Sequence, residues 1–292
     1  MNQAELGDVK NTHCSILELV VNGDISGVKS WALKNNPNLP ILGHWTALHL
    51  AVVAGKTEIC RILLESGSSV EGAINATRSP LMLAAEMGLA EIAKILIGEG
   101  ADVDKVSDDG QTALSLAAGC AIGDIRSLLE ANGNPNFITE SGDSCLCRAV
   151  LWAPTNVLPL LDGGADPNQK TSEGTPLTLA MDRGSKNTVE ALLNYGGNPA
   201  TKASNGSPLI FMAAKEGRTE ALRRIISEGV DPLSPEAMFE GKLPHETAVG
   251  ETGIYIRQYV KSRKKRDKLL NVAQRSTSLV DDSNDADDAV FM

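Results

Sequence analysis

A short phrase recurs along the chain at a nearly constant interval. It reads TALHLA from Thr46, SPLMLA from Ser79, TALSLA from Thr112, SCLCRA from Ser144, TPLTLA from Thr175 and SPLIFMA from Ser207, with offsets of 33, 33, 32, 31 and 32 residues. A second phrase of the type LLxxG follows each copy, with its glycines at Gly67, Gly100, Gly133, Gly164, Gly196 and Gly229. Two phrases with one period indicate an array of similar structural units.

The residues of one unit predict two helices and a turn. Thr or Ser at the first position can cap a helix, and Pro next to it suits the first helical turn, as in Thr175-Pro176. A Gly ends this helix. An apolar pair such as Ile95-Leu96 then lies on the inner face of a second helix, and the next Gly ends that helix. A polar stretch such as Asp108–Gly110 then turns the chain into the next unit. The first helices are expected to end at Gly55, Gly88, Gly184 and Gly217.

These phrases resemble the ankyrin repeat, with TALHLA at Thr46–Ala51 and GADPN at Gly164–Asn168 as the nearest matches. The resemblance covers roughly residues 14–250. It implies an all-α fold, a solenoid of about six to eight helix-turn-helix units with projecting turns. It also implies that the protein binds other proteins.

The domain organisation follows from the same register. We expect an N-terminal extension over residues 1–13 and a repeat domain over 14–254, followed by a disordered acidic tail over 269–292. An N-terminal cap occupies about 14–42, and the C-terminal cap, about 240–268, starts inside the repeat domain and extends past residue 254. The repeats start near 43, 76, 109, 141, 172 and 204.

The fourth repeat departs most from the pattern. Arg148 stands where Leu is usual, Pro154 and Pro159 flank the second helix, and the spacing is one residue short. We therefore expect that helix to be shortened or bent. The irregular unit is either a contact site for a partner or the result of sequence drift, since neighbouring repeats can stabilise a degenerate one.

Composition excludes several classes of function. The formal net charge of -10 argues against a general nucleic-acid surface, which needs clustered Lys and Arg. No run of about 18 apolar residues predicts a membrane span, and no signal peptide is apparent at the N-terminus. The cysteines, Cys14, Cys60, Cys120, Cys145 and Cys147, are odd in number and lack zinc-ligand spacing, so we interpret them as reduced thiols. These features favour a cytoplasmic and monomeric protein.

No catalytic, cofactor or metal motif is recognisable. The histidines, His13, His44, His49 and His245, are scattered and lie at no motif spacing from a Cys, Ser or carboxylate. His49 is part of TALHLA, and the resemblance implies that its ring hydrogen-bonds neighbouring turns. We therefore predict a protein without enzymatic activity and without a cofactor.

The resemblance implies a concave binding surface made of turn tips and the exposed ends of the first helices. The tips carried over by position are His44, Trp45, Arg78, Asp109, Gln111, Glu140, Asp143, Glu173 and Asn205. The helix ends are Val53, Glu86, Met87, Leu151, Trp152, Asp182, Arg183, Lys215 and Glu216. Trp45 and Trp152 are predicted anchors, because a tryptophan in a polar groove often dominates binding.

Each of these interpretations has an alternative. Trp45 and Trp152 can instead pack against adjacent turns, an alternative favoured for Trp152 by its neighbouring prolines and open for Trp45. Trp31 is assigned to the core of the cap. Asp108 and the acidic tips predict a partner with a basic segment, unless these charges serve solubility alone.

A basic run lies near the C-terminus, at Lys261, Arg263, Lys264, Lys265, Arg266 and Lys268. It is either a nuclear-localisation or anion-binding patch or the solvated cationic face of a helix, so nuclear entry is the alternative to a cytoplasmic location. Two weaker patterns follow it, the Ser276–Ser278 segment as a phosphorylation site and the terminal Val290–Met292 as a ligand of PDZ-type grooves.

Taken together, the sequence predicts a non-catalytic scaffold or adaptor that binds a partner protein in its concave groove. The alternatives are a stoichiometric inhibitor or assembly chaperone of one target, and a host-directed effector. No nucleic-acid partner and no membrane insertion are expected.

Overall fold

The computed structural model describes the backbone of residues 16–73, 77–183 and 186–284, with side chains up to residue 271. These residues belong to two compact units, of which the first ends at Asn198 and the second begins at Pro199. The predicted extension over 1–13, Cys14, His13, Gly184 and Val290–Met292 lie outside the described residues.

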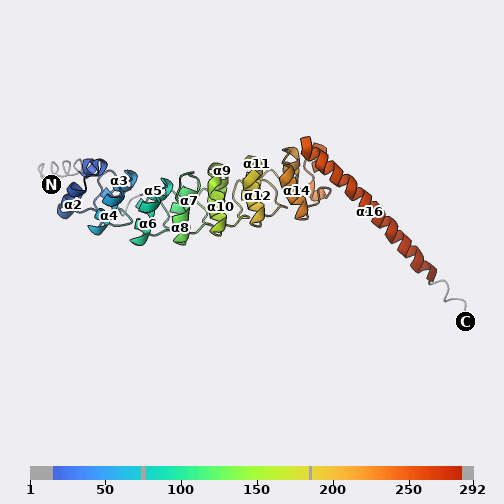
Figure 1. Cartoon of the computed structure of the whole chain (residues 1–292), viewed down its shortest axis with the longest axis horizontal. Helices are drawn as coiled ribbons and strands as arrows, with labels where there is room; N and C mark the ends of the chain where they lie inside the picture. The colour runs from blue at the N-terminus through green and yellow to red at the C-terminus, as the bar shows by residue number, and fades with distance from the viewer. Residues whose placement is uncertain (1–15, 74–76, 184–185, 285–292) are drawn as a thin grey trace. The chain divides into compact units, whose positions relative to one another are not determined.

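The first unit consists of helix pairs stacked in sequence order. Residues 16–22 are helical and pair with α2 (Ile25–Lys34). In Figure 1 the first helices of the following pairs form one row and the second helices another. The first row contains α3 (Ala47–Val53), α5 (Pro80–Glu86), α7 (Ala113–Ala118), α9 (Cys145–Trp152) and α11 (Pro176–Arg183). The second row contains α4 (Thr57–Glu65), α6 (Ala90–Gly98), α8 (Ile125–Glu130), α10 (Val157–Asp162) and α12 (Lys186–Asn194).

The repeated phrase forms the start of each first helix. The Ser79 hydroxyl accepts a hydrogen bond from the Met82 amide at 3.3 Å, and Ser144 accepts one from Cys147 at 3.1 Å, as caps. The leucine two residues after each cap is fully or almost fully buried: Leu48, Leu81, Leu114, Leu146 and Leu177. The predicted all-α repeat solenoid is confirmed, and within the described residues only isolated bridges, at the turns, represent β-structure.

The third repeat corrects the predicted position of one turn residue. In most repeats the glycine after the second helix has a left-handed backbone, for example Gly67 and Gly100 with φ of 87°. In the third repeat Asn132 takes this conformation, with φ of 62°, and Gly133 is the residue after it. Matching Gly133 to the other glycines is therefore wrong by one residue, because asparagine tolerates the left-handed region and can end the helix itself.

The second helix of the fourth repeat is short, as its prolines predict, although α8 of the third repeat contains no proline and has the same length of 6 residues. A 3-10 turn (Pro154–Asn156) precedes α10, which has only 6 residues. Asn156 is 7% exposed, and its side-chain amide points back to the preceding repeat. Its Nδ2 lies 2.9 Å from the Cys120 carbonyl oxygen and 3.3 Å from those of Ala117 and Ala118. This amide thus supplies donors to the last turn of α7.

The turns between repeats are joined by side-chain amides. The Asn136 Nδ2 donates to the Gly164 carbonyl at 3.1 Å, and its Oδ1 accepts from the Asp166 amide at 2.7 Å. Asn168 makes the same two bonds with the next turn, at 2.9 and 2.7 Å. Each of these asparagines therefore bonds the following repeat as both donor and acceptor.

Carboxylates replace these asparagines at two earlier junctions. Glu71 Oε1 accepts from the Asp102 amide, and Asp104 Oδ1 accepts from the Asn134 amide, both at 2.8 Å. A carboxylate has no hydrogen to donate, so the second bond of the asparagine pattern is not made by these side chains.

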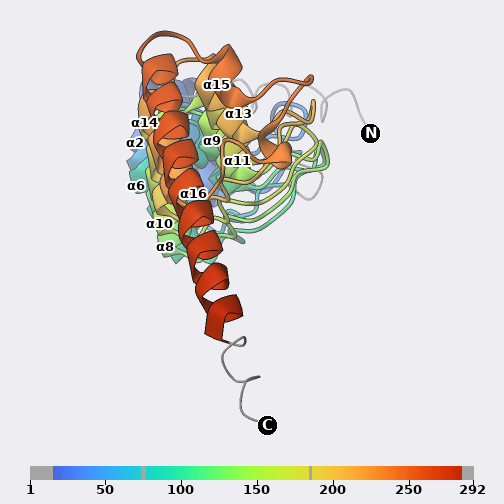
Figure 2. The same cartoon turned by 90° about the vertical axis from the view of Figure 1, so that its right-hand side faces the viewer.

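The second unit contains two further pairs. They are α13 (Leu209–Lys215) with α14 (Thr219–Ser227), and α15 (Pro244–Thr247) with α16 (Gly250–Asn284). A 3-10 turn (Pro235–Ala237) lies between the pairs. It accounts for the wide spacing between Pro208, directly before α13, and Pro244, the first residue of α15. Figure 2 shows α13, α14 and α15 beside the first turns of α16.

The long helix α16 is packed only at its start. Thr252, Gly253, Ile256 and Val260 are buried, whereas residues 264–271 are all exposed. The predicted boundary between cap and tail, at residue 269, falls inside this helix, whose backbone is helical to Asn284. The sequence here is rich in Lys, Arg and Leu, which favour helix. Residues 285–292 of the predicted tail lie outside the described part of the chain.

Candidate partner-binding surface

The turn tips of the first unit are tight and hydrogen-bonded across their base. The Ser107 amide donates to the Gln111 carbonyl at 2.8 Å, and the Thr139 amide donates to the Asp143 carbonyl at 2.9 Å. The predicted tip residues are exposed at His44, Asp108, Asp109, Glu140 and Glu173 and half-buried at Trp45, Arg78, Gln111 and Asp143. The tips thus present mainly polar and acidic side chains to solvent.

Three of the predicted site residues come together in one ion-pair cluster. Arg78 lies 2.6 Å from the Glu86 carboxylate at the end of α5 and 3.5 Å from the Asp109 carboxylate on the next tip. A hydrogen bond from Ser107 and, after it, the Arg78 charge hold the pKa of Asp109 below its ordinary value. The charge of Arg78 is therefore already balanced within the protein.

The remaining acidic tips have no cationic partner of this kind. Among the described residues, Asp108, Glu140, Asp143 and Glu173 take part in no ion pair. We call Asp108, Asp109, Glu140, Asp143 and Glu173 the tip row. Glu140 lies against the neighbouring tip, because a Cβ at Gly110 would lie 2.3 Å from its Cγ. The tip row therefore carries unbalanced negative charge over several repeats.

Trp45 is partly engaged within its own repeat. Its ring stacks on that of His49, with centroids 6.2 Å apart and planes at 16°. His49 is fully buried, its Nδ1 lies 3.1 Å from the Thr46 amide, and its Nε2 lies 3.1 Å from the Arg78 carbonyl. Burial lowers the pKa of His49. The predicted structural role of His49 is observed, and Trp45 is half-buried beside it.

Trp152 is the more exposed of the two predicted anchors. Its side chain is 57% exposed at the end of α9, and the Arg148 guanidinium lies 5.5 Å from its ring centroid. Along the other first-helix ends, Val53 and Met87 are each 38% exposed and Ile122, just after α7, is 72% exposed. The sequence reasoning missed Arg148 and Ile122 as surface residues. Two features of the sequence indicate these residues: Arg148 stands where other repeats have leucine, and Ile122 lies in the loop after a first helix.

The other predicted site residues, one tip and several helix ends, are spread over both units. Leu151 is half-buried, and Asp182 pairs with Arg183 at 3.3 Å. In the second unit Asn205 and Lys215 are exposed, and Glu216 pairs with Arg218 at 3.0 Å. Trp31 is 8% exposed and belongs to the core, as predicted.

The basic run lies on the part of α16 that leaves its packing partners. Arg263 is half-buried and pairs with Asp231 at 3.2 Å. The exposed members of the run are Lys261, Lys264, Lys265, Arg266 and Lys268. One residue of the run is thus structural, and the others face solvent.

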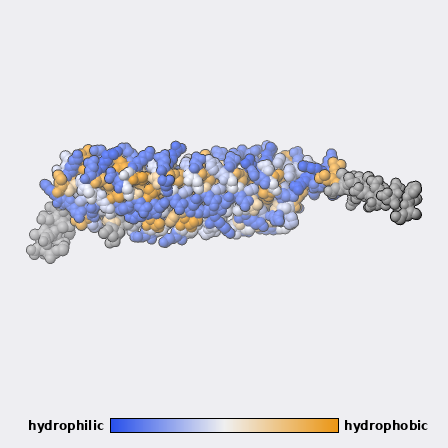
Figure 3. Space-filling model, turned by 90° about the horizontal axis from the view of Figure 1, so that it is seen from below, coloured by the Kyte–Doolittle hydropathy of each residue, from blue (hydrophilic) through white to orange (hydrophobic). Residues whose placement is uncertain are grey.

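No group of His, Cys, Asp and Glu suited to a metal ion occurs in the part of the chain that the structure describes. Burial raises the pKa of the Cys60 and Cys145 thiols to about 12. Across the described ranges no helix combines the length and the apolar character needed to span a membrane. Figure 3 shows a face on which polar residues predominate and apolar residues gather in small patches, mostly over the half nearer the N-terminus.

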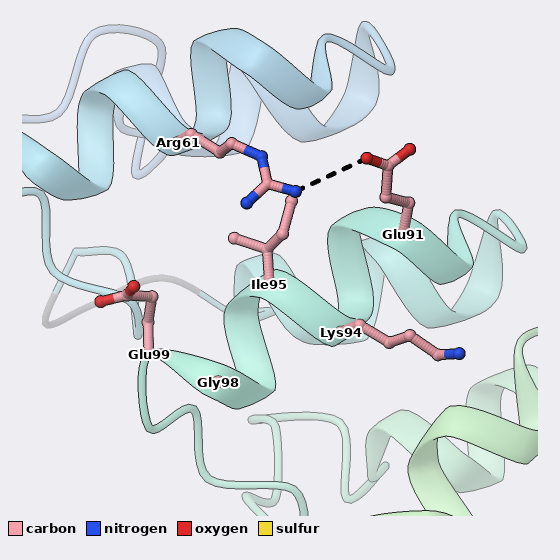
Figure 4. Close-up of a pocket in the computed structure, with 6 residues that line it drawn as sticks. All are labelled: Arg61, Glu91, Lys94, Ile95, Gly98 and Glu99. Atoms are coloured by element: carbon pink, nitrogen blue, oxygen red, sulfur yellow. Dashed lines mark ion pairs between the residues drawn. The ribbon is translucent and has the colours of Figure 1, made fainter.

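A shallow pocket lies between the second helices α4 and α6 (Figure 4). Arg61 reaches toward Glu91, 3.6 Å away, across Ile95, whereas Lys94 and Glu99 point elsewhere. The two charges that meet in this pocket balance one another, so it offers no convergent set of groups for chemistry.

Comparison with known proteins identifies the repeat. The family description "Ankyrin repeats (3 copies)" matches residues 9–107, 81–171 and 153–235. A search of the curated proteins finds no match.

Three solved structures illustrate the likeness. The human ASB11 ankyrin repeat domain aligns with a TM-score of 0.61 and 22% identity, over 74% of this chain and 98% of that one. The ankyrin repeat domain of Bcl-3, a member of the IkappaB protein family, aligns with a TM-score of 0.59 and 25% identity over 72% and 97%. An ankyrin repeat domain from Acinetobacter baumannii AYE aligns with a TM-score of 0.55 and 28% identity over 62% and 97%.

Proposed function

This chain belongs to the ankyrin-repeat family, and from that premise we propose that it is a non-catalytic scaffold or adaptor that binds a partner protein. Ankyrin repeats are in general protein–protein interaction modules, and the family is typically non-catalytic. The proposal places the partner along the tips and first-helix ends of the first unit.

One observation carries this proposal, namely that the repeated residues are buried whereas the tip residues, which are half-buried or exposed, differ from repeat to repeat. The leucines two residues after each cap are inaccessible. The residue directly before the cap changes from an aromatic ring to a cation, an amide and a carboxylate: Trp45, Arg78, Gln111 and Asp143. A stack needs only the repeated set for its stability, so the varied set is free to define a binding surface.

The charge of the tip row suggests the chemistry of the partner. Arg78 neutralises Asp109, but the other members of the row have no such partner among the described residues. We propose that the segment lying along the tips is basic, since complementary charge favours encounter and correct orientation. Binding should then weaken as salt is raised, because exposed charges are screened over about 10 Å at 0.1 M ionic strength.

The test compares charge reversal on two faces of the same chain. The tip variant carries Asp108→Lys, Glu140→Lys and Glu173→Lys, and the matched control carries Glu58→Lys, Glu65→Lys and Glu130→Lys on second helices. All six residues are exposed, so both variants should unfold at a similar temperature. Affinity capture from cell lysate, followed by binding of the purified partner, should show loss of the partner from the tip variant alone.

Two outcomes would count against this assignment. Retention of the partner by the tip variant, or equal loss from the control, would place binding elsewhere on the chain. Stoichiometry separates the adaptor from the inhibitor or assembly chaperone. Light scattering should detect a ternary complex for an adaptor, whereas an inhibitor should form one tight complex that suppresses its target's activity.

A further inference from the structure

The ends of α5, α7 and α9 carry an exposed patch that the repeat pattern does not require. It consists of Met87, Ile122, Arg148 and Trp152, and we call it the helix-end patch. Its apolar members are 38%, 72% and 57% exposed, in chain order. It belongs to consecutive repeats whose first helices lie side by side (Figure 1).

Two glycines bring these repeats into close contact. The Ile122 carbonyl lies so near Gly88 that a Cβ there would be 1.8 Å from its oxygen. A Cβ at Gly119 would lie 3.5 Å from the Arg148 guanidinium and 3.6 Å from the Trp152 ring. The side chains of the fourth repeat thus lie directly on the backbone of the third, which makes the patch continuous across the repeats.

Arg148 occupies a position that is leucine in the neighbouring repeats. The equivalent residues Leu50, Leu83, Leu116 and Leu179 are each no more than 8% exposed. Arg148 is half-buried, and its Nε has no hydrogen-bond partner although solvent does not reach it. A buried donor without an acceptor costs free energy, so the residue is not explained by the stability of the stack.

The charge of Arg148 is also unbalanced. No carboxylate in the described ranges forms an ion pair with it, whereas Arg78, two repeats earlier, pairs with both Glu86 and Asp109. Its guanidinium lies over one face of Trp152. An arginine held against a ring presents its fork of N–H groups in a fixed direction, which suits a carboxylate.

We propose that the helix-end patch binds a partner segment in which a carboxylate lies beside an apolar side chain. The carboxylate pairs with Arg148, and the apolar side chain packs on Trp152 and Ile122. Phosphate-bearing nucleic acid does not fit, because the neighbouring tip row is acidic and the chain carries a formal charge of -10. The inference rests on the proposed function and adds the partner's chemistry at the helix ends.

Short random peptides displayed on phage and selected on the full chain provide the probe. The selected peptides should share Asp or Glu next to a large apolar residue. For a synthetic peptide of this type, replacing its acid by the corresponding amide should weaken binding to the native chain by about 10-fold, as for loss of a charge-assisted hydrogen bond. The same replacement should have almost no effect on binding to Arg148→Leu, which carries the leucine of the other repeats.

Controls separate this inference from folding effects and from the proposed function. Arg126→Leu, on the exposed side of α8, should behave like the native chain, and Trp152→Ala should weaken every selected peptide. The inference is overturned if no peptide is selected, if acids are not enriched, or if the amide replacement weakens binding to Arg148→Leu equally. A partner that is lost from the tip variant but binds Arg148→Leu and Trp152→Ala normally would leave the proposed function standing and refute the helix-end site.

Discussion

Asn156 of the fourth repeat forms hydrogen bonds with the end of α7 in the third, and replacing it by leucine tests how much these bonds stabilise the protein. Leucine has nearly the same size but no N–H group. The Nδ2 of Asn156 has two hydrogens and three carbonyl oxygens within reach, the best placed being that of Cys120 at 2.9 Å. The substitution therefore removes two hydrogen bonds from the end of α7 without opening a large cavity.

The expected loss follows from these two bonds. Each hydrogen bond between neutral groups contributes about 1 kcal/mol net, and a carbonyl left buried without a donor costs about 1–3 kcal/mol. Asn156 is 7% exposed, so water has little access to replace it. We expect Asn156→Leu to lower the free energy of unfolding by about 2–3 kcal/mol.

Urea denaturation followed by far-UV circular dichroism measures this loss, and hydrogen exchange locates it. Amides at the end of α7 should lose protection first. The control, Asn194→Leu, changes an exposed asparagine at the end of α12 and should stay within about 0.5 kcal/mol of the native chain. A loss for Asn156→Leu as small as that of the control, with unchanged exchange, would refute the reasoning.

Three further predictions follow from other parts of the first unit. Asn132→Ala should lower the free energy of unfolding by about 1 kcal/mol, because alanine is strained at a φ of 62°, whereas Asn132→Gly should not; the urea midpoints of the two variants check this, and equal midpoints would contradict it. Burial lowers the pKa of His49, so its stabilising contribution is complete above the ordinary pKa of about 6.5 and is lost as pH falls below that value. The melting temperature should therefore fall more between pH 7 and pH 5, roughly, in the native chain than in His49→Gln. Burial raises the pKa of the Cys60 and Cys145 thiols to about 12, and it also raises that of half-exposed Cys120. Because solvent reaches Cys120, iodoacetamide at neutral pH should modify it before Cys60 and Cys145, and mass spectrometry showing equal rates for these thiols would oppose this assignment.

The fold could be predicted from sequence because the same local rules act in every repeat. A capping hydroxyl, a buried leucine and a left-handed glycine recur, so each copy supports the interpretation of the others. The sequence matched Gly133 to the other turn glycines, whereas Asn132 takes the left-handed backbone. The turn residue was therefore misplaced by one, because nothing in the sequence distinguishes a left-handed asparagine from any other. Acidic composition marks the predicted tail but does not show where α16 ends, because the Lys-, Arg- and Leu-rich residues before the tail favour helix and its backbone is helical to Asn284.

The candidate surface was predictable in location but not in detail. Register places Trp45 and Trp152 at a tip and a helix end, yet it does not reveal that His49 partly covers Trp45 or that Arg148 lies over Trp152. The pairing of Arg78 with Glu86 depends on how the turn folds back onto α5, which no spacing rule encodes. Such contacts arise from side-chain packing between repeats.

The amide bonds between repeats also have a mechanical meaning. Asn38, Asn136 and Asn168 each hold the following turn with two bonds. Glu71 and Asp104 each accept one bond from the backbone of the next turn, and Glu71 also pairs with Lys105 there at 2.8 Å. If the chain is pulled from its two ends, the load passes through every junction in series. Rupture is then expected to begin inside the stack, at the junction that Asp104 holds with one bond, and the junctions held by the asparagines should separate later.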